Sequence, residues 1–186
     1  DAPPTVDPDW SNVVVRSTFD TNANNIAAGA PNGGVPHTQH QNAQIVTTGQ
    51  KYGAGALRHD SDNAYLTYYN VASAFDPSGT WTVEFWLNID DFPSLGLLSG
   101  EYFTIWSQTY GSGAGDHSFG LLWTANNYNY QGVGTNAFKF FWRNGQTVSQ
   151  LHSDHIPTAL LQQYNHVAVV RNGNGDIVVY FNGYKL

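Results

Sequence analysis

Every second residue from Trp81 to Ile89 is apolar, and the residues between them are polar except for Trp86. The apolar set is Trp81, Val83, Phe85, Leu87 and Ile89, and the other set is Thr82, Glu84, Trp86 and Asn88. Because successive side chains of a strand point to opposite faces, this pattern predicts a β-strand with one buried face. The chain must therefore bury that face in a sheet-based core.

Further strands are expected where short apolar runs lie between turn residues. They are Val13 to Phe19, Ala43 to Thr48, Gly55 to His59, Ala64 to Tyr68, Tyr102 to Gln108, Ser118 to Trp123, Phe138 to Arg143, Asn165 to Arg171 and Asp176 to Asn182. Asn172-Gly173-Asn174-Gly175 predicts a hairpin, since Asn and Gly tolerate positive φ. The polar stretch from Asp20 to Asn42 is expected to lack regular structure over much of its length, and the only helical candidate is a short turn around Pro157 to Gln163. Many short strands without a long helix indicate an antiparallel sandwich or jelly roll.

Four segments occur in an order that is typical of one superfamily. They are Val14-Val15-Arg16-Ser17-Thr18-Phe19-Asp20, Lys51-Tyr52-Gly53-Ala54-Gly55-Ala56-Leu57, Trp81-Thr82-Val83-Glu84-Phe85-Trp86, and Tyr164 to Arg171 followed by Tyr180-Phe181-Asn182-Gly183. The chain thereby resembles the laminin-G-like and pentraxin-like branch of the concanavalin A-like lectin/glucanase superfamily. One departure is Tyr164, which stands where the family commonly has tryptophan. The resemblance implies an all-β fold, an antiparallel jelly-roll sandwich of two curved sheets, over residues 10–186 after an extended N-terminal arm over residues 1–9.

The resemblance also implies a setting and a set of partners. Such domains serve glycan binding, adhesion or attachment, some with calcium at a sheet rim, and they occur in extracellular enzymes and in viral tail or fibre proteins. They normally continue past the segment that matches Tyr180 to Gly183 with one more strand, whereas only Tyr184, Lys185 and Leu186 follow here. We therefore expect an open sheet edge that invites pairing with the arm, with a second copy or with a neighbouring chain. The alternative is that this last strand was trimmed, is disordered or is dispensable in this branch.

The composition favours a neutral, hydroxyl-rich ligand. The chain is 15% aromatic and only 11% charged, against about 25% charged residues in an average globular chain. Aromatic rings stack on the C–H face of a sugar, and amides and hydroxyls bond its hydroxyl groups. The net charge of −7 with seven scattered basic residues argues against a nucleic-acid partner. No apolar run is long enough to insert into a membrane.

Two segments that we interpret as aromatic loops are the candidate ligand-binding sites. They alternate rings with amides, which supplies stacking faces and hydrogen-bonding groups together. The candidate residues are Trp106, Tyr110, Asn126, Asn127, Tyr128, Asn129 and Tyr130. The alternative is that these rings pack onto the core.

Calcium is the candidate cofactor, and its expected site lies in the polar stretch that begins at Asp20. Asp20, Asn22, Asn24 and Asn25 place oxygen atoms near alternate positions after the first expected strand, and Ca²⁺ prefers oxygen ligands. The alternative is a cluster of Asx turns that only caps the strand.

Catalysis is not expected. Glycoside hydrolysis needs two facing carboxyl groups, and Glu84 is followed at strand spacing by Trp86 and Asn88 rather than by a second carboxylate. We expect Glu84 to pair with a neighbouring strand and His166 to be a packed, hydrogen-bonded side chain. The histidines of His152-Ser153-Asp154-His155 are expected in a polar loop and are too few for a zinc site.

The leading hypothesis is a non-catalytic carbohydrate-binding or cell-attachment module that is extracellular, at a cell surface or on a virion. The alternative is a structural or assembly domain of a virion tail or fibre or of a surface appendage. A glycoside hydrolase is the third hypothesis, since a second carboxylate can come from another strand.

Overall fold

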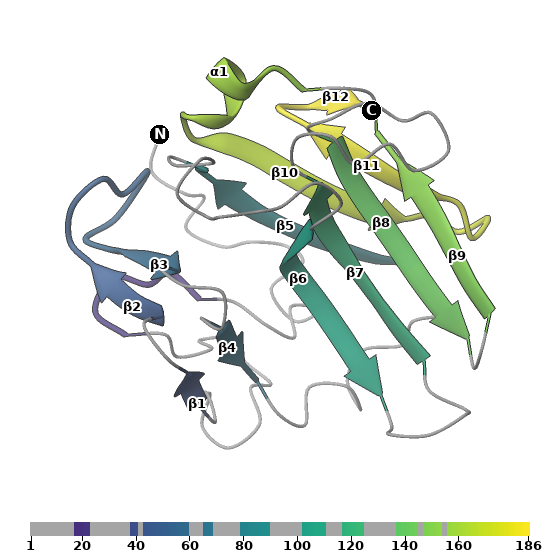
Figure 1. Cartoon of the computed structure of the whole chain (residues 1–186), viewed down its shortest axis with the longest axis horizontal. Coiled ribbons are helices and arrows are strands. Elements are labelled where there is room, and N and C mark those ends of the chain that lie inside the picture. Colours follow the sequence, from purple (N-terminus) through teal and green to yellow (C-terminus); the bar gives the residue numbers. More distant parts are fainter. Residues whose placement is uncertain are drawn as a thin grey trace. The chain divides into compact units, whose positions relative to one another are not determined.

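The computed structural model describes residues 17–22, 38–40, 43–59, 65–68, 79–89, 102–110, 117–124, 137–144, 147–153 and 156–186. Within these residues the protein is mostly strand, and every paired strand is antiparallel (Figure 1). The one described helix is α1, Thr158–Leu161, where the short turn was predicted. The all-β antiparallel class is therefore confirmed. The chain divides into two compact units, Asp1–Asp76 and Pro77–Leu186.

The first unit contains two short strand pairs. β1 (Thr38–His40) pairs with β4 (Tyr65–Thr67), and β2 (Ala43–Val46) pairs with β3 (Ala56–His59). β1 is an exception within the polar stretch that we expected to be irregular, because a distant strand supplies its hydrogen bonds. Ser17 to Phe19 were predicted to end a strand and are not in one, and the earlier part of that strand, residues 13–16, lies outside the described residues.

The second unit begins with the strand that the alternation predicted. β5 (Trp81–Leu87) has half-buried and exposed residues in strict alternation, and Ile89 is buried at 7% exposure. It pairs with β10 (Asn165–Arg171), which pairs with β11 (Ile177–Phe181), which in turn pairs with β12 (Tyr184–Lys185). The predicted side of β5 therefore faces inward, although most of its residues are only half-buried.

The other sheet of this unit has the order β6-β7-β8-β9. Its strands are β6 (Tyr102–Tyr110), β7 (His117–Thr124), β8 (Ala137–Asn144) and β9 (Thr147–His152). β9 was not predicted, because Thr147, Ser149 and Gln150 give it little apolar pattern. His152 therefore lies at the end of a strand and not in the polar loop that the sequence suggested.

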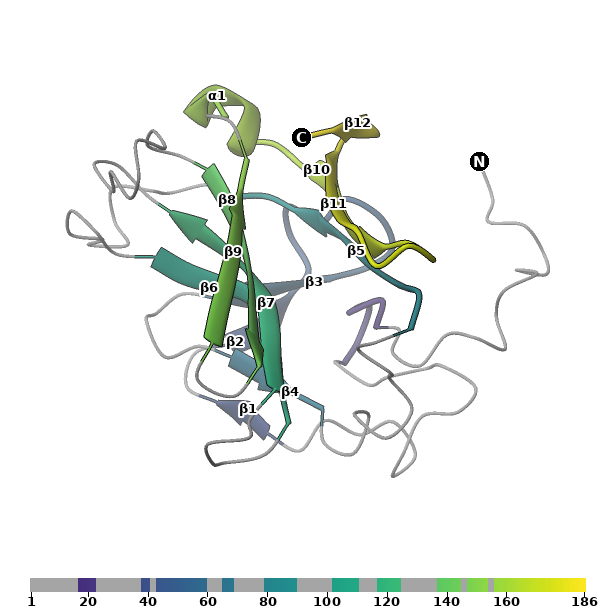
Figure 2. The ribbon, with the colours of Figure 1, turned by 90° about the vertical axis from the view of Figure 1, so that its right-hand side faces the viewer.

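Aromatic rings join the two sheets of the second unit, which form two layers in Figure 2. The Trp81 ring lies 6.3 Å from that of Phe140, and the Phe138 ring lies 6.0 Å from that of Phe181. Val167 and Val169 of β10 are completely buried on the same side. The core of this unit is thus built from alternate residues of both sheets.

Two turns that contain Asn and Gly join the last three strands of the chain. The predicted hairpin at residues 172–175 is confirmed, since Gly175 N donates to Asn172 O and Asn172 N to Asp176 O. Asn182 and Gly183 both have positive φ, 50° and 83°, as the two central residues of a type I′ turn require. This second turn produces β12, which the sequence analysis did not predict.

β12 covers only part of the edge of β11. Tyr184 and Lys185 stand opposite Phe181 and Tyr180, and Leu186 N donates to Val179 O. A groove of about 310 Å³ lies beside this edge. Its lining residues are Phe138, Leu151, Ser153, Asn172, Asp176, Ile177, Val178, Val179, Lys185 and Leu186. The edge is therefore partly closed by the chain itself, and a partner chain there stays a prediction.

The packing predicts a large cost for removing Phe138. This ring is 1% exposed and contacts Phe181, so Phe138→Ala should lower the free energy of unfolding by about 3–5 kcal/mol through the cavity that it leaves. Phe85→Ala should cost less, about 2 kcal/mol, because Phe85 is only half-buried. Denaturant unfolding measures both, with the exposed Thr82→Ala as control, expected to stay within about 0.5 kcal/mol. Equal, small losses in the two Phe variants would contradict the packing described.

Candidate functional site

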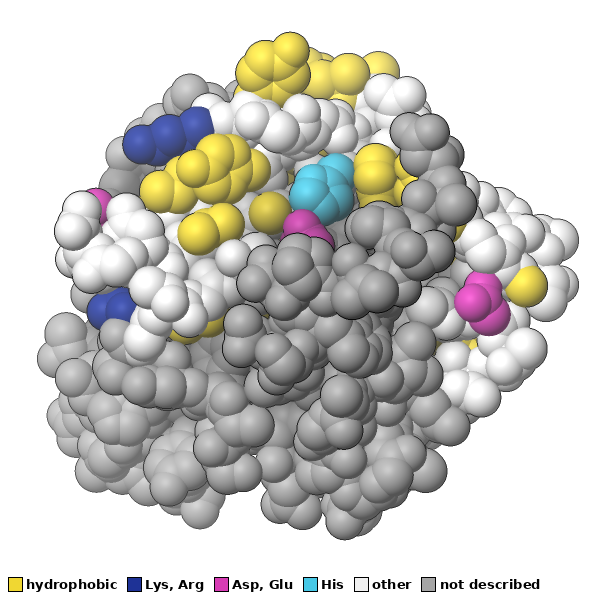
Figure 3. Space-filling model, turned by 180° about the vertical axis from the view of Figure 1, so that it is seen from behind, with side chains coloured by type: hydrophobic (Ala, Val, Ile, Leu, Met, Phe, Trp, Pro, Cys, Tyr) yellow, Lys and Arg dark blue, Asp and Glu magenta, His cyan; other side chains and the backbone are white. Residues whose placement is uncertain are grey.

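The outer face of the sheet β12-β11-β10-β5 carries the clearest group of exposed functional side chains. Val167 and Val169 point into the core, so the alternate residues His166 and Ala168 point outward. The register places Trp86 opposite His166 and Glu84 opposite Ala168. Figure 3 shows a face on which hydrophobic side chains lie on both sides of a histidine and an acidic residue.

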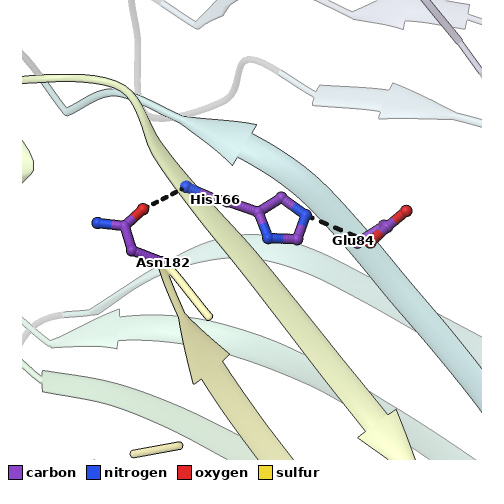
Figure 4. A network of polar contacts seen from close by, with 3 residues as sticks. All are labelled: Glu84, His166 and Asn182. Carbon is purple, nitrogen blue, oxygen red and sulfur yellow. Dashed lines mark hydrogen bonds and ion pairs between the residues drawn. The ribbon is translucent and has the colours of Figure 1, made fainter. Parts of the chain in front are cut away.

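Glu84, Trp86 and His166 contact one another, and we call these three residues the sheet-face site. His166 Nε2 lies 3.2 Å from Glu84 Oε2, on a diagonal between neighbouring strands (Figure 4). The rings of Trp86 and His166 are 5.3 Å apart and tilted by 52°. Trp86 remains 42% exposed, and the Glu84 side chain 64%, so both are open to a ligand.

Hydrogen bonds behind the site hold the backbone of His166. Its N–H donates to Asn182 Oδ1 at 2.9 Å, and its carbonyl accepts from Asn182 N at 2.8 Å. Asn182 Nδ2 donates to Oδ1 of Asn165, which is 1% exposed. Asn165 Nδ2 in turn donates to the carbonyls of Leu160 and Gln163. The backbone beside the sheet-face site is therefore tied through the exposed Asn182 to the buried Asn165.

The site residues were predicted only in part. Glu84 contacts a residue of the neighbouring strand, as expected, since it lies against His166. The hydrogen bond from His166 to Asn182 is made by the backbone N–H and not by the side chain. Trp86 was placed only on the same side of the expected strand as Glu84, so the three residues were not recognised as a group. Their alternate spacing in two strands was the available signal, but only the register brings the strands together.

The predicted aromatic loop residues are placed differently. Trp106 and Tyr110 lie within β6 rather than in a loop. The Trp106 ring is half-buried and lies 6.4 Å from Trp81, between the two sheets, because Trp106 stands opposite the fully buried Leu121. The other candidates, residues 126–130, lie outside the described residues. Ligand binding by this group stays a prediction.

Asp20 holds a loop of the first unit. Its Oδ1 accepts a hydrogen bond from Ala54 N at 2.6 Å, and a methyl group on Gly53 would clash with the same oxygen. The bond from Ala54 and a second one from Thr18 hold the pKa of Asp20 below its ordinary value of 3.8, against a small opposing effect of burial. This contact joins two of the four segments that carry the family resemblance.

The other candidate calcium ligands are not gathered around Asp20 in what the structure describes. Asn22 is exposed, and its Nδ2 donates to Thr21 Oγ1 at 3.4 Å, while Asn24 and Asn25 lie outside the described residues. Across the described ranges, no three or more His, Asp or Glu side chains form a group that could hold a metal ion. Calcium binding at Asp20 stays a prediction.

The sheet-face site offers an aromatic ring for stacking and groups that accept or donate hydrogen bonds. On the described part of its face it lacks a second carboxylate. The neighbouring outward positions are Thr82, Val170, Val178 and Tyr180. Asp176 lies in the hairpin turn, where its Oδ2 accepts from Asn172 Nδ2.

In the part of the chain that the structure describes, no helix is long and apolar enough to cross a bilayer.

Acid should weaken the first unit through Asp20. Because its pKa is lower in the folded than in the unfolded chain, its contribution is complete above about pH 3.8 and is lost as the pH falls through the lowered folded value. Asp20→Asn keeps an acceptor for Ala54 N but removes this titration. Thermal melts across the acid range should therefore show a shallower loss of stability in the variant, and identical slopes would contradict the assigned role.

Calcium should raise the melting temperature if Asp20 and its neighbours hold the ion in the folded state only. Melts in millimolar calcium and in chelator measure the difference, and Asp20→Ala should abolish it. Asn22→Ala should reduce it. Superimposable curves for the unmodified protein would remove the calcium hypothesis.

Comparisons with family models, curated proteins and solved structures give no match. The resemblance to laminin-G-like domains therefore rests on the four sequence segments.

Proposed function

We propose that this protein is a non-catalytic carbohydrate-binding or cell-attachment module whose strands form a jelly-roll sandwich of the concanavalin A-like type. The observation that carries the proposal is the sheet-face site, with an exposed Trp86 ring beside Glu84 and His166. The proposed setting is extracellular, on a cell surface or on a virion. Calcium at Asp20 belongs to the same proposal as an accessory ion.

The chemistry of the sheet-face site suits a sugar. The Trp86 ring offers an apolar surface to the C–H face of a pyranose. Glu84 lies two residues along the same strand, about 7 Å away, and accepts hydrogen bonds from hydroxyl groups. The contact with His166 restricts that carboxylate, so less side-chain freedom is lost when a ligand binds.

Binding without hydrolysis is supported by the surroundings of Glu84. The usual hydrolytic routes need an acid and a second carboxylate at about 5–10 Å. The described positions that face outward around Glu84 are Thr82, Trp86, His166, Ala168 and Tyr180, none of which is acidic.

An assembly domain is the second candidate function, and the groove beside β11 and β12 favours it. Leu151 is 52% exposed and Leu186 37% exposed at its lining. Apolar side chains beside a sheet edge are typical of surfaces that receive another strand. This function would use the edge and not the sheet-face site.

A glycan array tests the leading proposal. The unmodified protein should bind at least one class of glycan, and Trp86→Ala should weaken that binding about tenfold or more, since the ring supplies the stacking surface. Tyr184→Ala removes another exposed ring, 79% exposed, from β12 and should leave binding unchanged. Silence across the array, both with calcium and with chelator, would contradict the proposal and favour the assembly function.

A further inference from the structure

We propose that the sheet-face site prefers sugars that carry a free amino group over neutral or acidic sugars. This inference rests on the proposed carbohydrate-binding function and names the ligand class of the same site. It follows from the charge of Glu84, from the partners of that charge, and from the place of the Trp86 ring beside it.

Glu84 keeps most of its hydrogen-bonding capacity for a ligand. Its side chain is 64% exposed, and Oε2 lies 3.2 Å from His166 Nε2. An ionised carboxylate offers about four acceptor positions on its two oxygens. The described contact therefore leaves Oε1 and part of Oε2 available, and His166 acts as a positioning residue that orients the group.

No lysine or arginine on the described part of this face stands next to Glu84. The cross-strand row that contains it runs through Ala168 and Tyr180 to Lys185. Neighbouring strands are about 4.8 Å apart, so the backbone of Lys185 lies about 14 Å from the backbone of Glu84. Arg171 stands opposite Trp81 on the inward positions of the sheet and donates to Gly79 O. A cationic ligand group is thus the natural complement of Glu84.

Trp86 places an aromatic surface on the same side of the same strand. A sugar ring stacked on Trp86 can direct a substituent toward Glu84, two residues away. An ammonium group there gains a charge-assisted hydrogen bond, which is about twice as strong as a neutral one. Attraction to the indole face adds to this bond. The net charge of −7 also favours cations and opposes acidic sugars.

Calorimetry with three matched oligosaccharides tests the inference. The oligomers share linkage and length and differ only at one carbon, which carries a free amine, an N-acetylated amine or a hydroxyl group. The unmodified protein should bind the free amine about tenfold tighter than the other two near neutral pH. This preference should shrink in high salt, because exposed charges are screened.

Glu84→Gln is the deciding variant, since it keeps the shape and the hydrogen bonding of the side chain and removes the charge. It should bind all three oligomers with about equal affinity. Thr82→Ala, on the same face of the same strand, should keep the preference. Trp86→Ala should weaken binding of all three, and far-ultraviolet circular dichroism verifies that each variant is folded.

The outcomes separate this inference from the proposed function. Equal binding of the three oligomers by the unmodified protein, or an amine preference that survives in Glu84→Gln, would overturn the amine specificity and leave carbohydrate binding standing. Binding of the amine oligomer with an affinity that Trp86→Ala does not change would also overturn it, since the cause would then be the general negative charge. If the unmodified protein binds none of the three oligomers and no glycan on the array, the proposed function itself is overturned.

Discussion

The buried amide of Asn165 is the interaction on which the second unit depends. It is 1% exposed, and it bonds the carbonyls of Leu160 and Gln163 on one side and the amide of Asn182 on the other. These bonds join the end of α1, the start of β10 and the turn after β11. A buried amide is costly without partners, so its full satisfaction favours one arrangement of these three segments.

The sheet-face site follows from this arrangement. Asn182 bonds both backbone groups of His166, and the register of β10 with β5 then puts His166 against Trp86 and Glu84. His166 is thus held at its backbone by Asn182, which is bonded in turn to the buried Asn165. Binding of the proposed sugar would remove little additional conformational freedom from the protein, because the Glu84 carboxylate is already restricted beside the exposed Trp86 ring.

Several elements could be predicted because their signal is local. The alternation from Trp81 to Ile89 and the Asn-Gly hairpin after Arg171 both appear in the structure where expected. β9 was missed because its residues have no clear apolar period, and its pairing with β8 alone makes it a strand. β1 was missed for the same reason, since β4 supplies its partner. The burial of Lys139, 7% exposed in β8 with a pKa lowered by that burial, also had no local signal.

By itself, the sequence determined the strand-rich class, the inward side of β5 and the positions of the tight turns, because side-chain period and Asn-Gly pairs act over a few residues. Only the tertiary structure decided which strands are neighbours and in what register. The strand pairing places Trp106 beside Trp81, between the two sheets, and Trp86 beside His166 on the outer face. The reason is physical: a two-residue period states which residues share a face of one strand, but pairing between distant strands depends on the packing of the whole unit.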